Sequence, residues 1–269
     1  MKFPLMMIAM CMFSSTTLAA EPPVAPALIK IPAGKINTAA CPAGKTICPE
    51  GDYVRQIVDV AAFEMGATEV TFAEWDACVQ DHACAEPQSG WAYEQRPVVA
   101  PCVEGVPCQY PDDRGWGRGQ RPVINVSWED VQRYLTWLHA KTGVQYRLPT
   151  SAEWEYAALA NATTKFPWGA TLGKNNANCD GCGSKWDNRQ TAPAASFKPN
   201  RFGLHDMIGN VAEWVSTCFP SREQGSQECN TYIYRGGAWP SVAKAMDPRG
   251  YQALFGNLRK DYIGFRIAR

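Results

Sequence analysis

The sequence predicts a mixed fold of helices and short strands whose long irregular segments are held by disulfides. Three observations support this: capped amphipathic helices before about residue 165, a later part dense in glycine, asparagine, proline and tryptophan, and closely spaced cysteines. In the later part only short runs, such as 231–234 and 264–268, look like strands. Long irregular segments need cross-links, metals or buried side chains, because unpaired backbone groups are costly to bury. A chain of 269 residues with 46% hydrophobic content can form one large domain or two small ones.

Three helices are indicated by capping signals. Thr71 and Thr150 are each followed three residues later by a glutamate and then by an apolar run, the pattern of a capping box. A third helix is expected to begin at Ser127 and to stop at Gly143, since glycine accepts the left-handed conformation that ends many helices. We interpret the apolar stripes of these helices as core.

The N-terminus has the layout of a secretory signal peptide. Lys2 precedes a short apolar run over 3–13, a polar stretch and a small-residue end, and the run is too short to span a bilayer. We expect residues 1–20 to be removed, leaving a proline-rich lead-in over 21–28 and a periplasmic or secreted protein with no transmembrane segment. An uncleaved anchor is the alternative.

The cysteines fall in neighbouring pairs. Cys11 lies in the signal segment, which leaves an even set of ten. An even number in an exported protein favours disulfides. For Cys179 and Cys182, half of a zinc site or a redox pair are alternatives to a local disulfide. We predict five local disulfides: Cys41–Cys48, Cys78–Cys84, Cys102–Cys108, Cys179–Cys182 and Cys218–Cys229.

Charge and motif content argue against two classes of function. The formal net charge is zero and no basic run occurs, so the footprint of a nucleic-acid-binding protein is missing. The sequence has three histidines, no serine in a nucleophile-elbow motif, and no phosphate-loop motif. His205 beside Asp206 could act as a general base, but we expect a structural role for it.

Two stretches carry oxygen ligands of the kind that calcium prefers. In "FGLHDMIGNVAEW", Asp206 and Glu213 flank a glycine-containing turn, which could combine carboxylates with backbone carbonyls. The alternatives are a helix-cap or turn role for Asp206 and a buried arginine partner for Glu213. In "NCDGCGSKWDNR", Asn178 and Asp187 lie in a loop that contains two cysteines.

Several ordered stretches are specific as a set: "RPVINVSWEDVQRYLTWLHAKTGVQYRLPTSAEWEYAALA", "FPWG", "TAPAASFKPNRFGLHDMIGNVAEW", "YRGGAW" and "GFRIAR". Together they resemble the formylglycine-generating enzyme family, also called sulfatase-modifying factors, most strongly over 121–269. The resemblance implies a single α+β domain over 29–269 with a C-type-lectin-like core, little regular secondary structure and bound calcium.

The resemblance assigns ligands for one or two calcium ions. One ion would use the side chains of Asp206 and Glu213 and the carbonyls of Gly209 and Val211. The other would use the side chains of Asn178 and Asp187 and the carbonyls of Cys179 and Arg189. The spacing after Asp187 is one residue shorter than in some members of the family, and this difference bears on the assignment of Arg189.

The copper site of the family does not carry over. Formylglycine-generating members hold Cu(I) between two cysteines five residues apart after a Gly-Gly turn, and thiolates make such a site select Cu(I). These positions are Ser241 and Met246 here, the serine that follows the glycines is Ala238, and the tryptophan before Glu213 is Ala212. We therefore expect no copper and no formylglycine-generating activity.

The altered pocket favours a non-catalytic recognition, accessory or immunity-type binding protein. A lectin-like fold can present loops to a protein or small ligand without chemistry. The expected contact residues are Trp239, Met246, Arg249 and Tyr251.

The alternative is an oxygen-dependent oxidoreductase. The family includes exported proteins that oxidise the pyoverdine siderophore precursor, and a small aromatic substrate could bind near Trp239 and Tyr251. The iron-dependent ergothioneine-type members need histidines from an additional domain that this sequence lacks.

Overall fold

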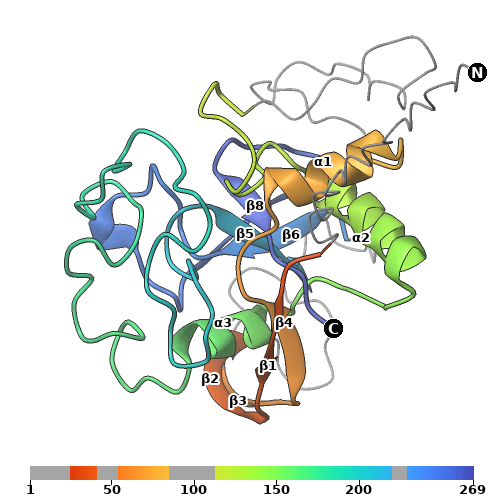
Figure 1. The fold of residues 1–269 in the computed structure, drawn as a ribbon. Helices are drawn as coiled ribbons and strands as arrows, with labels where there is room; N and C mark the ends of the chain where they lie inside the picture. The colour runs from red at the N-terminus through yellow and green to blue at the C-terminus, as the bar shows by residue number, and fades with distance from the viewer. Residues whose placement is uncertain (1–24, 41–53, 85–112, 220–228) are drawn as a thin grey trace, which may run out of the picture.

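The computed structural model describes residues 25–40, 54–84, 113–219 and 229–269 (Figure 1). The expected signal peptide and the cysteine pairs Cys41–Cys48 and Cys102–Cys108 lie outside the described residues. The elements are β1 (Leu28–Ile31), β2 (Gly34–Ala40), β3 (Val54–Val60), β4 (Phe63–Gly66), α1 (Phe72–Gln80), α2 (Trp128–Thr142), α3 (Ser151–Leu159), β5 (Ala212–Cys218), β6 (Thr231–Arg235), a 3-10 turn (Ala243–Ala245), β7 (Tyr251–Phe255) and β8 (Ile263–Phe265).

The three expected helices are confirmed together with their caps. Thr71, Ser127 and Thr150 each accept a hydrogen bond from the third residue of their helix, and a side chain there returns the bond, as a capping box requires. Helix α2 ends at Thr142 and is capped by Gly143, which adopts the left-handed conformation with φ 69°. Local sequence signals were sufficient here because a cap is a contact within one turn of the chain.

The strands form three small sheets. A four-stranded sheet has the order β7-β6-β5-β8, in which β5 and β8 run parallel, and β1-β4 and β2-β3 are antiparallel pairs. The expected strand at 231–234 is confirmed as β6, whereas the run at 264–268 forms the shorter β8. Strands β1 to β5 and β7 were not expected from the sequence.

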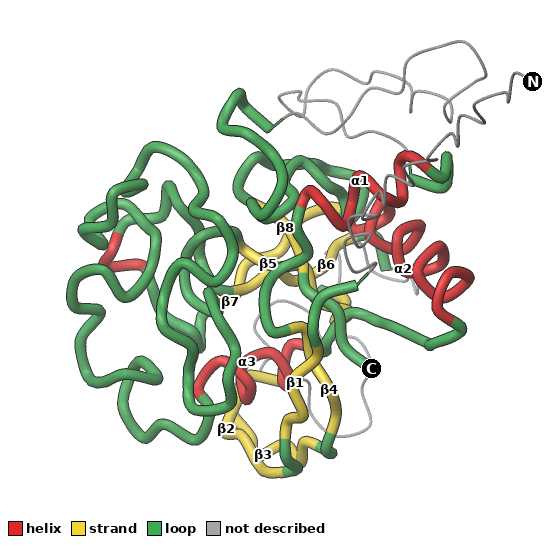
Figure 2. Tube along the Cα trace, in the orientation of Figure 1, coloured by secondary structure: helices red, strands yellow, loops and turns green. Residues whose placement is uncertain are grey.

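Loops occupy much of the structure (Figure 2). Residues 160–211, between the end of α3 and the start of β5, contain no helix or strand. Their loops lie on one side of the molecule, beside the segment that follows β6 (Figures 1 and 2). Their positions therefore depend on hydrogen bonds, buried side chains and cross-links, as the composition predicted.

Three of the five expected disulfides lie in the described residues, and all three are formed: Cys78–Cys84, Cys179–Cys182 and Cys218–Cys229. They fit a protein of an oxidising compartment. Among the described residues, no helix has the length and apolar character needed to cross a bilayer.

The buried core falls into three groups of side chains. The largest packs α1 and α2 against β5 and β8, with Trp75 stacked on Tyr134 at 5.4 Å between ring centroids. A second group packs α3 against β1, β4 and the chain around Leu204. The third lies under the loops and contains the Cys179–Cys182 disulfide and Met246. The candidate site lies where these groups meet.

Candidate functional site

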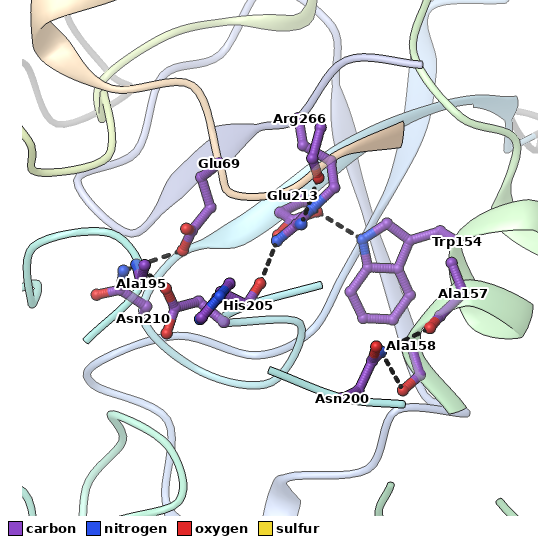
Figure 3. Close-up of polar contacts among 12 residues, drawn as sticks. Glu69, Trp154, Ala157, Ala158, Ala195, Asn200, His205, Asn210, Glu213 and Arg266 are labelled. Carbon is purple, nitrogen blue, oxygen red and sulfur yellow. Dashed lines mark hydrogen bonds and ion pairs between the residues drawn. The ribbon is translucent and has the colours of Figure 1, made fainter. Parts of the chain in front are cut away.

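A buried ion pair between Glu213, in β5, and Arg266, directly after β8, lies at the centre of the site. Arg266 Nε and Nη2 donate to Glu213 Oε2 and Oε1, each at 2.7 Å, and Trp154 Nε1 donates to Oε2 at 2.6 Å (Figure 3). Glu213 is 1% exposed and Arg266 0%. Of the alternatives that the sequence left open for Glu213, the structure has the buried arginine partner.

Two further carboxylates lie beside this pair. Glu69, between β4 and α1, accepts a hydrogen bond on Oε1 from Asn210 Nδ2 at 2.9 Å (Figure 3). Asp206 Oδ2 accepts the backbone N–H of Ala195 at 2.6 Å. Their other oxygens, Glu69 Oε2 and Asp206 Oδ1, are buried and have no hydrogen-bond partner among the described residues. We call Glu69, Asp206, Glu213 and Arg266 the carboxylate cluster.

Burial shifts the pKa of the two carboxylates of the cluster that are not paired with Arg266. Burial, together with the nearby Asp206, raises the pKa of Glu69 well above its ordinary value. Burial raises the pKa of Asp206 to about 6, against the lowering effects of the Ala195 amide and Arg266. Burial acts to lower the pKa of Arg266, but Glu213 more than compensates, so the pKa is raised and the guanidinium stays charged.

The residues of the first expected calcium site lie in a strained turn. Asp206, Gly209 and Asn210 have φ values of 56°, 84° and 60°. A Cβ on Gly209 would lie 2.4 Å from the carbonyl oxygen of Asn178, so a side chain is excluded at this position. The N–H of Asn210 donates to the same carbonyl at 2.8 Å. The two expected calcium loops are therefore adjacent.

In the second loop, residues 178–187, the side-chain oxygens already have donors. Asp187 accepts the N–H of Gly181 at 2.7 Å and of Gly183 at 2.5 Å, and Asn178 Oδ1 accepts the Ser184 hydroxyl at 2.8 Å. Cys179 is fully buried in its disulfide with Cys182. We call this segment the disulfide loop.

Arg189, at the end of this ligand set, is exposed and donates through Nη2 to the carbonyl of Lys185 at 2.9 Å. Among the described residues, no three His, Cys, Asp or Glu side chains form a metal-binding group. A cation in either loop would thus need backbone carbonyls or water among its ligands. In the first loop, Asp206 Oδ1 has no hydrogen-bond partner among the described residues and could bind an ion. In the second loop, Asp187 could do so only if its hydrogen bonds from the N–H groups of Gly181 and Gly183 were broken.

The two positions of the family's copper cysteines come together at the Gly-Gly turn. A Cβ placed on Gly237 would lie 2.7 Å from Met246 Sδ and 3.7 Å from Ser241 Oγ. Ser241 Oγ accepts the N–H of Ala238 at 3.0 Å, which closes the turn. Ala238 and Ala212 are both buried.

The expectation that Met246 forms part of an exposed binding surface is wrong. Met246 is 0% exposed and packs in the loop core with Phe166, Ile208 and the Cys179–Cys182 disulfide. The reason is the left-handed turn at Gly237, with φ 68°, which leaves a space where a side chain would stand and which the thioether occupies. A local sequence pattern does not show that packing.

The disulfide loop holds the Gly-Gly segment in place. The N–H of Asp180 donates to the carbonyl of Ser241 at 2.9 Å, and the N–H of Ala243 donates to the carbonyl of Asp180 at 2.7 Å. The Gly236 carbonyl accepts the N–H of Gly209 at 3.0 Å on the other side of the turn. The Gly-Gly segment therefore lies between the two expected calcium loops.

Trp239 is half-buried and forms an aromatic surface with Trp116. The two rings meet edge to face at 5.1 Å between centroids, and Trp239 Nε1 donates to the carbonyl of Asp261 at 3.1 Å. Arg114 pairs with the Asp261 carboxylate at 2.5 Å, and its guanidinium lies 5.5 Å from the Trp116 ring centroid. We call these four residues the tryptophan surface.

The remaining expected contact residues have structural partners. Arg249 donates to the carbonyls of Lys165 and Thr164 at 3.1 and 3.2 Å. The Tyr251 ring lies 5.7 Å from the guanidinium of Arg235, which is buried and pairs with Glu155 at 3.1 Å. Both side chains are half-buried, so each retains some accessible surface.

Comparison with known proteins decides the family. A family model described as the sulfatase-modifying factor enzyme 1-like domain matches residues 15–269. The chain belongs to this family. The formylglycine-generating enzyme of Bos taurus is 28% identical over 241 residues, which are 76% of this chain and 61% of that protein. The chain thus spans less than two thirds of that curated relative.

Two other similar proteins match over most of their length. The inactive C-alpha-formylglycine-generating enzyme 2 of Mus musculus is 26% identical over 278 residues, covering 90% of this chain and 85% of that protein. The structure of PvdO from Pseudomonas aeruginosa superposes with a TM-score of 0.70 and 29% identity, covering 94% of this chain and 97% of that chain. The fold is therefore that of the sulfatase-modifying factor family.

Two residues of the site, Glu69 and Trp116, were not predicted from the sequence. Glu69 follows β4 in the stretch "MGATEV", where a lone acidic residue in an apolar run was the available signal. Trp116 lies in a glycine-rich loop distant in sequence from Trp239, and nothing local links the two. His205 has the structural role that was expected, with Nδ1 at 2.8 Å from the Phe197 carbonyl and its own carbonyl accepting from Arg266.

Proposed function

We propose that this sulfatase-modifying factor relative is an exported recognition protein that binds its ligand at the tryptophan surface and has no formylglycine-generating activity. The observation that carries the proposal is that the side chains of Ser241 and Met246 both have structural roles. The serine oxygen closes the Ala238 turn, and the methionine sulfur is buried under Gly237. Neither position offers the thiolate that a Cu(I) site needs.

The tryptophan surface offers contacts typical of ligand recognition. Trp116 and Trp239 present large half-buried rings at a small cost in conformational entropy, and such residues dominate binding energies in many interfaces. The pair formed by Arg114 and Asp261 borders the rings and supplies both signs of charge. These contacts suit a protein partner or a small ligand that carries an aromatic or sugar ring.

Calcium is part of this proposal. The 206–211 segment is irregular and contains left-handed residues, and the N–H of Trp239 donates to the Asn210 carbonyl within it at 2.8 Å. A bound ion would stabilise that segment and, through it, the position of the Trp239 ring.

The proposal is tested by affinity capture from the cell envelope of the source organism with the mature protein and two variants. Trp239→Ala is expected to lose the specific partner or ligand. Trp168→Ala, which removes another partly exposed tryptophan distant in sequence from this surface, is the matched control and is expected to retain it. Equal capture by all three proteins would contradict the proposal. Conversion of a cysteine-containing sulfatase peptide by the purified protein would contradict its second half.

The second candidate function is oxygen-dependent oxidation of a small aromatic substrate, as in the pyoverdine-maturation members of the family. The observation in its favour is the similarity to PvdO, which extends over 94% of this chain and 97% of that chain. A dihydro-chromophore substrate is expected to change its absorption spectrum and to consume oxygen when the protein is added. An unchanged spectrum across a range of added metals would leave the recognition function.

A further inference from the structure

Within the tryptophan surface, the guanidinium of Arg114 has both an aromatic and an anionic partner. Its Cζ lies 5.5 Å from the Trp116 ring centroid, and its Nη1 donates to Asp261 Oδ2 at 2.5 Å. The planes of Trp116 and Trp239 are inclined at 82°, so the two indoles form a nearly right-angled corner. Aromatic rings beside a carboxylate are the groups with which proteins bind organic cations.

Arg114 stands at a backbone position that disfavours its residue type. The N–H of Trp116 donates to the carbonyl of Asp113 at 3.0 Å and closes a four-residue turn. The two central residues, Arg114 and Gly115, have φ values of 59° and 70°. Positive φ at both central positions is the pattern of a type I′ turn, in which glycine, asparagine and aspartate dominate. A strained backbone of this kind indicates that the Arg114 side chain has a role at the surface.

The backbone that carries the Asp261 carboxylate is held by contacts that do not involve Arg114. The Asp261 carbonyl accepts a hydrogen bond from Trp239 Nε1 at 3.1 Å. The carbonyl of the next residue, Tyr262, accepts the N–H of Ala212, in β5, at 2.8 Å. This segment and the Trp239 ring are therefore already in place before any ligand arrives, and such preorganisation favours binding.

The ion pair between Arg114 and Asp261 is accessible to solvent. The two side chains are 48% and 24% exposed. Pairs with this exposure contribute little to stability, because water and salt screen the charges and the long side chains lose conformational freedom. Exchange of the Arg114 guanidinium for a second cation therefore requires little free energy.

We propose that the corner formed by Trp116, Trp239 and Asp261 binds an organic cation, a guanidinium or ammonium group of the ligand, and that Arg114 is an intramolecular competitor which occupies the site when no ligand is bound. The proposal rests on the proposed recognition function for the location of the ligand, and it adds that the ligand carries a positive charge. Arg114 would then lower the apparent affinity for cations and select against weakly bound ones.

The experiment follows the indole N–H signals of Trp116 and Trp239 by NMR while the full mature protein is titrated at constant ionic strength. The variants Trp116→Phe and Trp239→Phe assign the two signals. The cationic probe is N-acetyl-arginine methylamide, and N-acetyl-citrulline methylamide is the neutral probe of the same shape. N-acetyl-glutamate methylamide is the anionic probe, and tetramethylammonium shows whether the site accepts an ammonium group as well as a guanidinium.

Three variants separate the competitor from the carboxylate. Arg114→Gln removes the competing guanidinium, and Asp261→Asn removes the negative charge. Lys185→Gln is the matched control, because it removes another exposed cation, which lies 4.4 Å from the Trp186 ring centroid. Thermal unfolding shows that each variant is folded.

We expect the cationic probe to shift both indole signals with half-saturation at millimolar concentration, and the citrulline probe to bind at least about tenfold more weakly. Arg114→Gln is expected to bind the cationic probe about two- to fivefold more tightly than the wild type, because the site no longer has to release its own guanidinium. Asp261→Asn is expected to bind it about tenfold more weakly. Lys185→Gln is expected to bind it as the wild type does.

Two results overturn the inference. The first is that the cationic probe leaves both indole signals unchanged in the wild type and in Arg114→Gln. The second is that the wild type binds the anionic probe and Arg114→Gln loses it, because Arg114 would then be the recognising group. If Asp261→Asn does not fold, the comparison of Arg114→Gln with the wild type decides.

The recognition function itself fails in a different way. If affinity capture is lost with Trp239→Ala but kept with Asp261→Asn, the ligand binds at the tryptophan surface without a cation, so the inference fails and the recognition function stands. If Trp239→Ala captures as much as the wild type, the recognition function at this surface fails whatever the probes do.

Discussion

Arg266 and Glu213 form a fully buried two-point ion pair that joins the parallel strands β5 and β8. The guanidinium also donates to the carbonyls of Gly66 and His205, at 3.0 and 2.9 Å. One arginine thus connects the end of β4, the central sheet and the loop that contains His205.

Breaking this pair is expected to be strongly destabilising. Glu213→Gln removes the hydrogen-bonded counter-ion of the buried Arg266 and leaves only the weaker interactions of its charge with Glu69 and Asp206, and the expected loss is about 3–5 kcal/mol in the free energy of unfolding. Denaturant unfolding of the purified protein measures it. Glu64→Gln, which affects the more exposed pair with Arg269, is the control and is expected to change little. A loss as small as that of the control would show that the pair contributes little.

Placing thiolates at 241 and 246, the positions that the family resemblance assigns to the copper cysteines, is expected to create a Cu(I) site. Ser241 Oγ and Met246 Sδ both lie within 4 Å of the point where a Gly237 Cβ would stand. The double substitution Ser241→Cys and Met246→Cys should bind one equivalent of Cu(I) under reducing conditions, because thiolates select that ion.

A competition titration with a Cu(I) chelator measures the affinity of the double variant. The wild type and the single variant Ser241→Cys are the controls and are expected to bind at least about tenfold more weakly. Stoichiometric Cu(I) binding by the wild type would mean that Met246 serves as a metal ligand.

Removing the Cys179–Cys182 disulfide is expected to loosen the Gly-Gly segment. Asp180, inside the disulfide loop, exchanges hydrogen bonds with Ser241 and Ala243. In the variant Cys179→Ser with Cys182→Ser, amide hydrogen exchange over 241–246 should therefore become faster than in the wild type.

The disulfide Cys78–Cys84 at the end of α1 provides the comparison for that measurement. Replacing both of its cysteines by serine should change exchange near α1 and leave 241–246 as in the wild type. Equal effects on 241–246 from both double variants would indicate a general loss of stability instead of local support.

Glu153 is expected to make acid stability depend on the capping box of α3. Burial acts to raise its pKa, but hydrogen bonds from Arg147 and the Thr150 amide outweigh this, and the pKa is lowered. Because the pKa is lower in the folded state, ionised Glu153 stabilises the fold at pH values above its unfolded pKa of about 4.3. This stabilisation is lost as the pH falls through the folded pKa. Glu153→Gln should therefore be less stable than the wild type near neutral pH, and the difference should shrink in acid. Denaturant unfolding at several pH values measures it, and a constant difference would contradict the assignment.

The sequence by itself determined the local features and the family. Capping boxes at Thr71, Ser127 and Thr150 and the disulfides Cys78–Cys84, Cys179–Cys182 and Cys218–Cys229 each join residues close in the chain, so residue types and spacing were enough to predict them. The absence of cysteine from residues 234–249, where the resemblance to the family would place a copper-binding pair, can likewise be read directly from the sequence.

Only the tertiary structure decided which distant side chains meet. Glu69 and Asn210 are 141 positions apart, and Glu213 and Arg266 are 53 apart. The burial of Met246 depends on the missing side chain of Gly237, because a Cβ there would lie only 2.7 Å from Met246 Sδ. These contacts depend on how irregular segments pack against each other, and local sequence patterns carry no information about that packing. For this reason the sequence allowed a buried arginine partner for Glu213 but could not identify it as Arg266, and it gave no sign that Glu69 bonds Asn210.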